Sequence, residues 1–225
     1  MNILIVGGGL QALSVARSLK KERYSVIALL HRGDISTKSK YIDELYTIDI
    51  TPTYKKEYLS SVHRVLQVHA ISVIIPLSDV TAEFLSIHKV NLEHEYHLKC
   101  AIPNYDIFQK ANDKWQLMDL CKENFIPHPR TQLLTSSNLQ EAAGAIGFPA
   151  LIKPNISVGA RGITMVCSLS DLQDKYDGIL RKYGECTLQE YIDTSGAPYY
   201  NVMMYRDEKG NIINTAIIEI IRYYP

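Results

Sequence analysis

The chain has 225 residues, 46% of them hydrophobic and 21% charged, and its 24 basic side chains balance 24 acidic ones. This is the composition of a globular protein with one large or two small domains, and the zero net charge argues against a general nucleic-acid-binding protein. No apolar run reaches membrane-spanning length and no basic region precedes the first strand, so we expect a cytoplasmic protein without a signal peptide or a membrane partner.

The first hundred residues alternate strand patterns with helical ones. Strands are expected at residues 2–6, 25–30, 45–48 and 72–77, and helices at residues 10–20, 54–69 and 80–87. Repeated strand–helix units predict a parallel sheet with right-handed crossovers.

A glycine-rich turn follows the first strand, where Gly7-Gly8-Gly9-Leu10-Gln11-Ala12 fits the G-x-G-x-x-A fingerprint of dinucleotide-binding domains. The fingerprint expects an acid at the end of the second strand, but no acid occurs there before Asp34. Arg32 could instead meet the 2′-phosphate of NADP. The same turn also serves simply to let a helix pack closely on a sheet, so both interpretations stay open here.

The pattern changes after Pro103, and the chain is expected to divide into two domains, 1–108 and 109–225. In the second part, helices are expected at 112–124, 138–145 and 168–183, and strands at 130–134, 186–192, 199–205 and 212–218. Two further strands flank a glycine loop that lies between Lys153 and Ile163. Four residues of the first of these helices are expected to face inward: Trp115, Met118, Leu120 and Cys121.

The cysteines and histidines do not form a metal-binding pattern. The four cysteines are widely spaced, contain no Cys-x-x-Cys pair and are expected to be buried thiols in a reducing compartment: Cys100, Cys121, Cys167 and Cys186. His94 and His97 lie near Cys100 in a charged segment, which favours a solvated surface over a zinc site. No metal ligand is predicted in this chain.

The most informative segment is the strand that ends at Lys153 and the loop after it, which contains Gly159, Arg161 and Gly162. A strand-borne cation beside a loop of small residues suits a polyphosphate, because the lysine supplies a point charge and backbone N–H groups can close over the oxygens. The loop is not a P-loop, because Lys153 precedes the glycines. A strand–turn–strand hairpin needs no ligand, and these residues alone do not decide between the two interpretations.

From Asn112 onward, the order of these features resembles the ATP-grasp superfamily. Four segments are similar to its motifs: Asp113-Lys114, Phe148-Pro149-Ala150-Leu151-Ile152-Lys153-Pro154, Ser157-Val158-Gly159-Ala160-Arg161-Gly162-Ile163 and Gln189-Glu190-Tyr191-Ile192. The first hundred residues resemble the domain that precedes the ATP-grasp domain in this family. The resemblance implies an α/β fold in which a Rossmann-like parallel sheet is followed by an incomplete α+β ATP-grasp domain.

The resemblance also implies the site residues. Ten residues would bind ATP: Lys114, Lys153, Ser157, Gly159, Ala160, Arg161, Gly162, Glu190, Tyr191 and Ile192. The two lysines would meet the phosphates from opposite sides, and the last three residues would bind the adenine edge. Tyr199 takes the place of the family's ribose-binding acid, a role that Asp193 or water would then supply. The magnesium ligands of the family are expected downstream of this chain, and catalytic residues are not assigned.

The implied function is that of an ATP-dependent carboxylate–amine or carboxylate–ammonia ligase that works through an acylphosphate, most similar to the carbamoyl phosphate synthase large subunit. The chain would be the front portion of such an enzyme and inactive alone. Its partners would be a small carboxylate and an amine or ammonia, with no nucleic acid, and the resemblance allows a homodimer. The alternatives are an NADP-linked oxidoreductase and a non-catalytic nucleotide-binding protein.

Overall fold

The computed structural model describes residues 1–53 and 55–221 of the chain. These residues form two compact units, Met1–Leu117 and Met118–Pro225, and each unit is described by itself. Tyr54, the first residue of the helix expected at 54–69, lies outside the described residues.

The first unit is built on a parallel sheet, as the repeated strand–helix pattern predicts, but the sheet has five strands instead of the four expected, because the short β5 was missed. Its strands are β1 (Asn2–Val6), β2 (Ser25–His31), β3 (Glu44–Ile48), β4 (Ile71–Pro76) and β5 (Lys99–Cys100), in the order β3-β2-β1-β4-β5. Neighbouring strands pair in parallel throughout the sheet. The order changes direction between β1 and β4, so the carboxyl ends of these two strands meet at a point where ligands bind in many α/β proteins.

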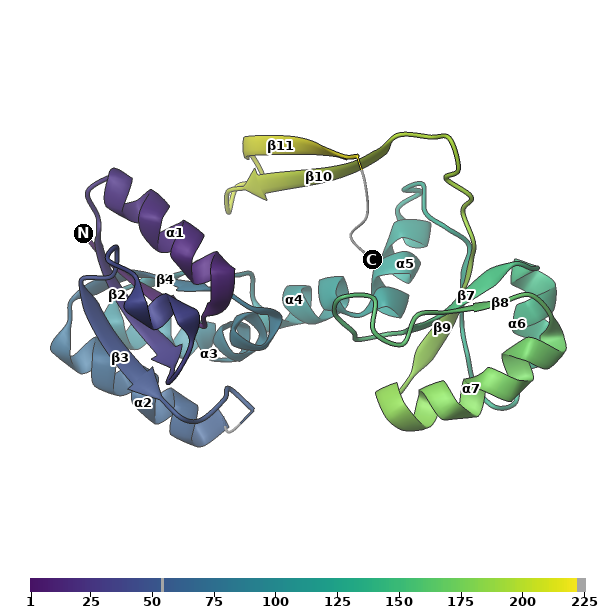
Figure 1. Ribbon diagram of the computed structural model, residues 1–225, viewed down its shortest axis with the longest axis horizontal. Helices are drawn as coiled ribbons and strands as arrows, with labels where there is room; N and C mark the ends of the chain where they lie inside the picture. Colours follow the sequence, from purple (N-terminus) through teal and green to yellow (C-terminus); the bar gives the residue numbers. More distant parts are fainter. Residues whose placement is uncertain (54, 222–225) are drawn as a thin grey trace. The chain divides into compact units, whose positions relative to one another are not determined.

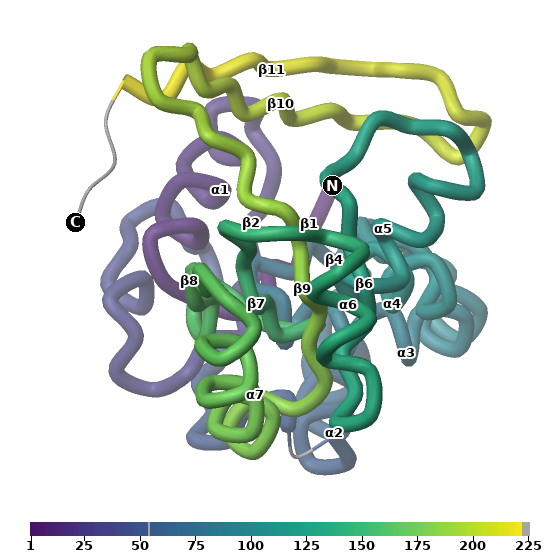
Figure 2. The backbone as a smooth tube through the Cα atoms, turned by 90° about the vertical axis from the view of Figure 1, so that its right-hand side faces the viewer, coloured from purple at the N-terminus to yellow at the C-terminus, as the bar shows by residue number. Residues whose placement is uncertain are grey.

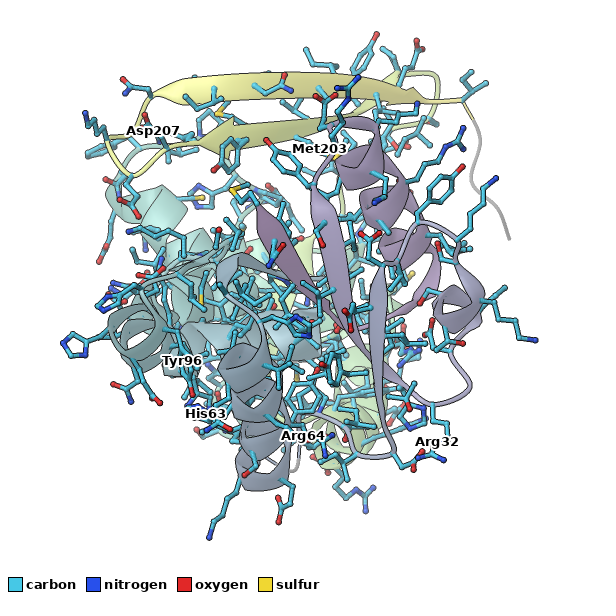
Figure 3. All side chains as sticks on the ribbon, turned by 90° about the vertical axis from the view of Figure 1, so that its left-hand side faces the viewer. Arg32, His63, Arg64, Tyr96, Met203 and Asp207 are labelled. Carbon is cyan, nitrogen blue, oxygen red and sulfur yellow. The ribbon has the colours of Figure 1, made fainter. Side chains whose placement is uncertain are left out.

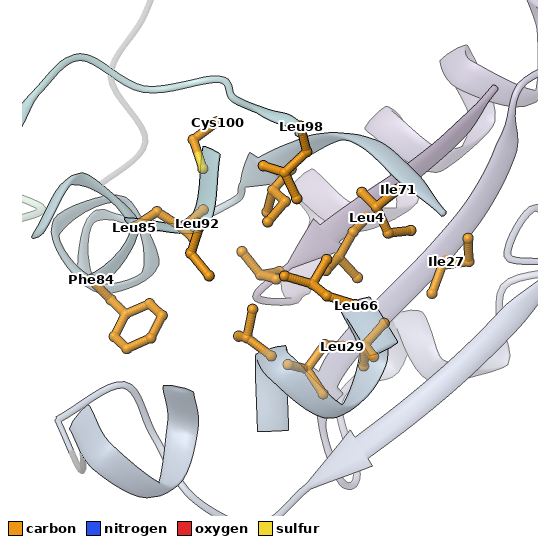
Figure 4. Packing of buried hydrophobic residues seen from close by; sticks show 14 of the residues in the cluster. Leu4, Ile27, Leu29, Leu66, Ile71, Phe84, Leu85, Leu92, Leu98 and Cys100 are labelled. Carbon is orange, nitrogen blue, oxygen red and sulfur yellow. The ribbon is translucent and has the colours of Figure 1, made fainter. Parts of the chain in front are cut away.

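Helices cover both faces of this sheet (Figure 1). They are α1 (Gly9–Lys21), α2 (Lys55–Val68) and α3 (Asp79–Tyr96). Two further elements, the short η1 (Ile35–Lys38) and α4 (Tyr105–Asn112), pack against α1 and α3 respectively. In β1, Leu4 packs into the core beneath α2 and α3, whereas Ile5 packs into a separate core beneath α1. Figure 4 shows the first of these cores, with Leu4 close to Leu66 and Ile71. Two covered faces explain why the central strands are continuous apolar runs rather than alternating ones.

The structure corrects the helices expected around residues 80 to 124. The helix expected at 80–87 is α3, which continues to Tyr96 and ends where His97 adopts a left-handed conformation. The helix expected at 112–124 is α5 (Lys114–Glu123), and a further helix that was not expected, α4, precedes it and ends at Asn112 before the extended backbone of Asp113. A carboxylate oxygen of Asp113 accepts the N–H of Gln116 at 3.0 Å, so Asp113 begins a new helix instead of continuing the old one.

Two expectations about burial are wrong in part. Of the four residues of α5 that were expected to face inward, Leu120 is exposed, whereas Trp115, Met118 and Cys121 are partly buried. Among the cysteines, Cys100 and Cys186 are buried thiols as expected, but Cys121 is only partly buried and Cys167 is exposed.

The second unit contains a four-stranded antiparallel sheet. Its strands are β6 (Thr131–Leu133), β7 (Ala150–Pro154), β8 (Thr164–Val166) and β9 (Cys186–Glu190), in the order β6-β9-β7-β8 (Figure 2). The helices α6 (Leu139–Ile146) and α7 (Leu169–Tyr183) pack on one face of this sheet, against Ile152 and Leu188. Because side chains alternate along a strand, every second side chain of β7 and β9 points to the opposite face.

A hairpin of two long strands follows this sheet. β10 (Tyr199–Arg206) and β11 (Ile212–Ile220) pair antiparallel with each other, and every side chain of β10 is exposed. The polar turn between them is held by Asp207, whose carboxylate accepts the backbone N–H groups of Lys209 and Asn211 (Figure 3). Over the described residues, no helix is long and apolar enough to cross a membrane.

Candidate functional site

The side chain of Lys153 lies on the face of the second unit's sheet that α6 and α7 do not cover, which is called the open face below although Thr187 and Gln189 are buried on it. In β7, Ala150, Ile152 and Pro154 are buried toward the helices, so Leu151 and Lys153 point to the other face. Lys153 is half-buried at the outgoing end of the strand, next to the loop that leads into β8. A half-buried ammonium needs a polar partner, because burial without one is costly.

Gln189 on the neighbouring strand β9 supplies a partner for Lys153. The lysine Nζ donates a hydrogen bond to Gln189 Oε1. The Nε2 of Gln189 in turn donates to the hydroxyl of Thr131 at 2.9 Å, and that hydroxyl donates to the carbonyl of Pro129 at 2.9 Å. Three strands thus contribute to the hydrogen-bond chain that ends on the lysine.

The loop after Lys153 has the conformation of two successive tight turns. The N–H of Arg161 donates to the carbonyl of Val158, and the N–H of Ile163 donates to that of Ala160, both at 3.2 Å. Gly159, Ala160 and Gly162 have left-handed backbone angles, with φ of 60°, 59° and 77°.

Two glycines of this loop differ in their surroundings. A Cβ on Gly162 would lie 2.7 Å from Pro154 Cγ and 2.9 Å from the Tyr183 ring, whereas one on Gly159 would meet nothing within 4 Å. Gly162 therefore allows the loop to approach the end of β7. Ser157 is partly exposed, while Gly159, Ala160 and Arg161 are exposed and accessible to a ligand.

The residues expected at the adenine edge lie at the outgoing end of β9. The strand ends at Glu190, so Tyr191 and Ile192 follow it with exposed side chains. The carboxylate of Glu190 binds Arg130 instead of facing open solvent, with 2.7 Å between Arg130 Nε and Glu190 Oε2. The N–H of Tyr191 donates to the carbonyl of Pro149 at 3.3 Å.

Lys114, the other expected phosphate ligand, is the first residue of α5 and follows the capping residue Asp113. Burial lowers the pKa of its ammonium below the ordinary value, although the nearby carboxylate of Asp113 opposes the shift. Lys114 belongs to the unit Met1–Leu117 and Lys153 to the unit Met118–Pro225. That both lysines meet the same phosphates therefore stays a prediction.

Two residues were expected near the ribose, Asp193 and Tyr199. Asp193 is exposed, and its carboxylate accepts the N–H of Ser195 at 2.9 Å, which lowers its pKa below the ordinary value. Tyr199 is the first residue of β10. The ribose-binding role of either residue remains a prediction.

The glycine-rich turn of the first unit is closed by the chain's own carboxylate. The N–H of Gly9 lies 3.0 Å from Asp34 Oδ1 and 2.9 Å from Oδ2, and a Cβ on Gly8 would lie 2.1 Å from Oδ2. Burial alone would raise the pKa of Asp34, but hydrogen bonds from Ser36 and from the Gly9 N–H bring it below the ordinary value. An anion thus already occupies the helix N-terminus where a dinucleotide would place its pyrophosphate.

Sequence reasoning missed three residues of the site, namely Arg130, Thr131 and Gln189 as side-chain partners. Thr131 and Gln189 stand opposite each other in the register of β6 and β9, and their side chains share a face with Lys153. The alternation of buried and exposed residues in each strand predicts which face of the sheet a side chain occupies. The sequence of either segment alone does not predict that β6 pairs with β9.

Comparisons with known proteins show what the chain is similar to. Residues 112–222 match the family model "Carbamoyl-phosphate synthase L chain, ATP binding domain". The carbamoyl phosphate synthase large chain of Saccharolobus solfataricus is 26% identical over 220 residues, which are 94% of this chain and 20% of that protein. The D-aspartate ligase of Enterococcus faecium is 23% identical over 167 residues, which are 69% of this chain and 38% of that protein.

A solved structure shares the fold. The biotin carboxylase domain dimer of the Hydrogenobacter thermophilus 2-oxoglutarate carboxylase, in complex with MgADP, ADP and bicarbonate, aligns with a TM-score of 0.76 at 20% identity. The alignment covers 94% of this chain and 48% of that one. The chain spans about a fifth of the length of the carbamoyl phosphate synthase large chain that it matches.

Proposed function

Since residues 112–222 belong to the ATP-grasp superfamily, as a relative of the ATP-binding domain of the carbamoyl-phosphate synthase L chain, we propose that this chain binds ATP for an ATP-dependent ligase. The proposed reaction joins a carboxylate to an amine or to ammonia. The carboxylate oxygen attacks the γ-phosphorus of ATP and ADP leaves. The nitrogen nucleophile then attacks the acylphosphate carbon, and inorganic phosphate leaves.

The observation on which the proposal rests is the position of Lys153. Its ammonium lies on the open face of a sheet, beside a loop with three left-handed residues, and it donates a hydrogen bond to Gln189, the residue before the last one of β9. The loop can present backbone N–H groups to phosphate oxygens while the lysine supplies the charge. In phosphoryl transfer, catalysis is chiefly positioning and charge neutralisation, which is what such a site supplies.

In this proposal the site residues have separate roles. Lys153 and Lys114 neutralise phosphate oxygens, and the loop from Ser157 to Gly162 covers them. The backbone of Glu190, Tyr191 and Ile192 binds the adenine edge through groups other than the N–H groups of Glu190 and Tyr191, which already donate to the carbonyls of Arg130 and Pro149. The carboxylate of Glu190 is not used for this purpose, because Arg130 already binds it.

The described residues fit ATP better than they fit its metal ion. The exposed glycine loop and the strand-end lysine suit a polyphosphate, as argued above. Within residues 1–53 and 55–221, no three histidine, cysteine, aspartate or glutamate side chains gather to hold a metal ion. We therefore assign no magnesium ligand and derive no step through the metal.

An NADP-linked oxidoreductase is disfavoured. The Asp34 carboxylate occupies the turn that would hold the pyrophosphate, and the relatives are ligases and carboxylases. We propose instead that the first unit is the Rossmann-like domain that precedes the ATP-grasp domain, which its strand order β3-β2-β1-β4-β5 supports. The proposed domains are 1–108 and 109–225, although the compact units divide within α5. A homodimer stays a proposal.

Titration calorimetry with a non-hydrolysable ATP analogue tests this function. The chain should bind the analogue, and Lys153→Ala should abolish measurable binding, whereas the exposed Lys182→Ala on α7 should bind normally. Gly9→Val should not change ATP binding, because Gly9 belongs to the turn closed by Asp34. Binding of NADPH that is lost in Gly9→Val and kept in Lys153→Ala would support the oxidoreductase instead.

A further inference from the structure

We propose that Gln189 is a positioning residue for Lys153: it holds the lysine ammonium before nucleotide binds and releases it to the phosphates when ATP enters. The proposal rests on the ATP site proposed above. Its basis is the hydrogen-bond chain from Lys153 through Gln189 and Thr131 to the carbonyl of Pro129.

The two end groups of this series of hydrogen bonds determine which atom donates and which accepts at each step. The ammonium of Lys153 can only donate hydrogen bonds and the carbonyl of Pro129 can only accept them. The hydroxyl of Thr131 donates to Pro129, so it accepts from the amide nitrogen of Gln189, and the amide oxygen must then face the lysine. The orientation of the Gln189 amide is thus fixed by the network rather than chosen freely.

Burial makes this orientation stable. Gln189 is only 7% exposed, so water cannot readily replace its partners on either side. Thr131 and Gln189 are opposite residues of β6 and β9, and Lys153 lies on β7, the strand on the other side of β9. The ammonium is therefore held on the open face by three paired strands, which reduces the ordering needed when a ligand binds.

The neutral charge of Gln189 is the functionally important property. A glutamate at this position would form an ion pair with Lys153 and cancel the charge that a phosphate needs. A glutamate would also have no N–H to donate to the hydroxyl of Thr131, so the hydrogen bond between these two residues would be lost or reversed, and Thr131 could no longer accept from residue 189 while donating to Pro129. An amide satisfies the ammonium while leaving its full positive charge, and a phosphate can displace it or share the ammonium with it.

Gln189→Glu tests the proposal, with the exposed Gln140→Glu on α6 as the control for the same chemical change. We expect Gln189→Glu to weaken ATP binding by about tenfold or more, because the added carboxylate would pair with Lys153 and repel the phosphates. Adenosine, which has no phosphate, should bind to Gln189→Glu with the same affinity as to the wild type. Calorimetry for ATP and ligand-observed NMR for adenosine give the two affinities, and circular dichroism checks the fold.

If Gln189→Glu weakens the binding of ATP and of adenosine equally, Gln189 has only a structural role. If the ATP affinity is unchanged, Gln189 does not act on Lys153. Either result overturns the proposal.

If Gln189→Glu does not fold, the variants Thr131→Val and Thr131→Ser test the proposal in its place. Thr131→Val should weaken ATP binding about threefold, while Thr131→Ser, which keeps the hydroxyl, should bind normally. Equal binding by the two Thr131 variants would overturn the proposal.

The same data separate this proposal from the function on which it rests. If the wild type binds no ATP, or if Lys153→Ala binds it as well as the wild type does, the proposed function fails and this proposal fails with it. If Lys153→Ala loses binding and Gln189→Glu does not, only the role of Gln189 is wrong.

Discussion

Arg130 and Glu190 lie 60 residues apart in the sequence and form a two-point contact where β6 begins and β9 ends. The carboxylate of Glu190 accepts the Arg130 backbone N–H at 2.8 Å and the guanidinium Nε at 2.7 Å, and the Glu190 N–H donates to the Arg130 carbonyl at 2.9 Å. The guanidinium also reaches the carbonyl of Ala145 at the end of α6. The contact therefore fixes the strand end from which the proposed adenine-binding residues follow.

Arg130→Ala should lower stability slightly and nucleotide affinity more clearly. The arginine side chain is 64% exposed, so solvent screens the ion pair and its loss should cost only about 0.5–1 kcal/mol in the free energy of unfolding. The strand end would become less ordered, which should weaken adenine binding. Urea unfolding and ATP calorimetry measure the two effects, with the exposed Arg181→Ala as control. If Arg130→Ala has the stability and the ATP affinity of the wild type, the contact between Arg130 and Glu190 does not order the end of β9.

The stability of the second unit should depend on pH through Glu190. The backbone N–H and then the guanidinium of Arg130 hold the pKa of Glu190 below its ordinary value of 4.5. Because the folded pKa is depressed, this stabilisation is complete above pH 4.5 and is lost as the pH falls through the lower, folded pKa. The difference in unfolding free energy between wild type and Glu190→Gln should therefore shrink below pH 4.5. A difference that stays constant from pH 7 to pH 3 would contradict the assignment.

The glycine loop offers a matched pair of substitutions. Gly159 and Gly162 both have left-handed backbone angles, so alanine costs about 1–2 kcal/mol at either position for conformation alone. At Gly162 the added methyl group would also collide with Pro154 and Tyr183, whereas at Gly159 it would meet open space. Gly162→Ala should therefore be the more destabilising of the two in urea unfolding. Equal losses would mean that the loop does not pack against the end of β7 as described.

Asp34 should stabilise the first unit without serving a dinucleotide. Its carboxylate accepts the N–H groups of Gly9 and Ser36, so Asp34→Ala should cost about 1–2 kcal/mol of stability. Neither the wild type nor Asp34→Ala should bind NADPH in a fluorescence titration, and ATP binding should be unchanged. NADPH binding to the wild type at micromolar concentration would be incompatible with a turn that is closed by Asp34.

Local patterns predicted the elements of both units well, and long-range pairing explains most of what they missed. The buried strands of the first unit and the strands on either side of the glycine loop are visible as apolar runs, because period and composition are local properties. The contact of Asp34 with Gly9 spans 25 residues and that of Arg130 with Glu190 spans 60, and no local pattern encodes either. The helix α4 was missed because its eight residues span little more than two turns, which is too short to establish a helical period.

The local motifs of the candidate site can be recognised in the sequence, but the contacts between its strands cannot. The motif around Lys153 suits a phosphate site but, taken alone, is equally compatible with a plain hairpin; only its combination with the segment Gln189-Glu190-Tyr191-Ile192 favours ATP. The neutral partner of that lysine could not be predicted, because the sheet order β6-β9-β7-β8 places Gln189 beside it. Whether the residues of the two units meet one ligand is a question for the binding experiments above.

The start of α7 provides a stability prediction in which sequence and structure agree. The helix expected at 168–183 is α7, and Ser168 caps it: its hydroxyl oxygen accepts the N–H of Asp171 at 3.1 Å. Ser168→Ala should therefore cost about 1 kcal/mol, because it leaves a backbone donor of the first turn without its partner. Ser170, exposed within the same turn, is the matched control, and Ser170→Ala should be neutral or slightly stabilising because alanine is the better helix former. Urea unfolding of the two variants should differ by about 1 kcal/mol, and an equal response would mean that α7 is held by its contacts with the sheet alone.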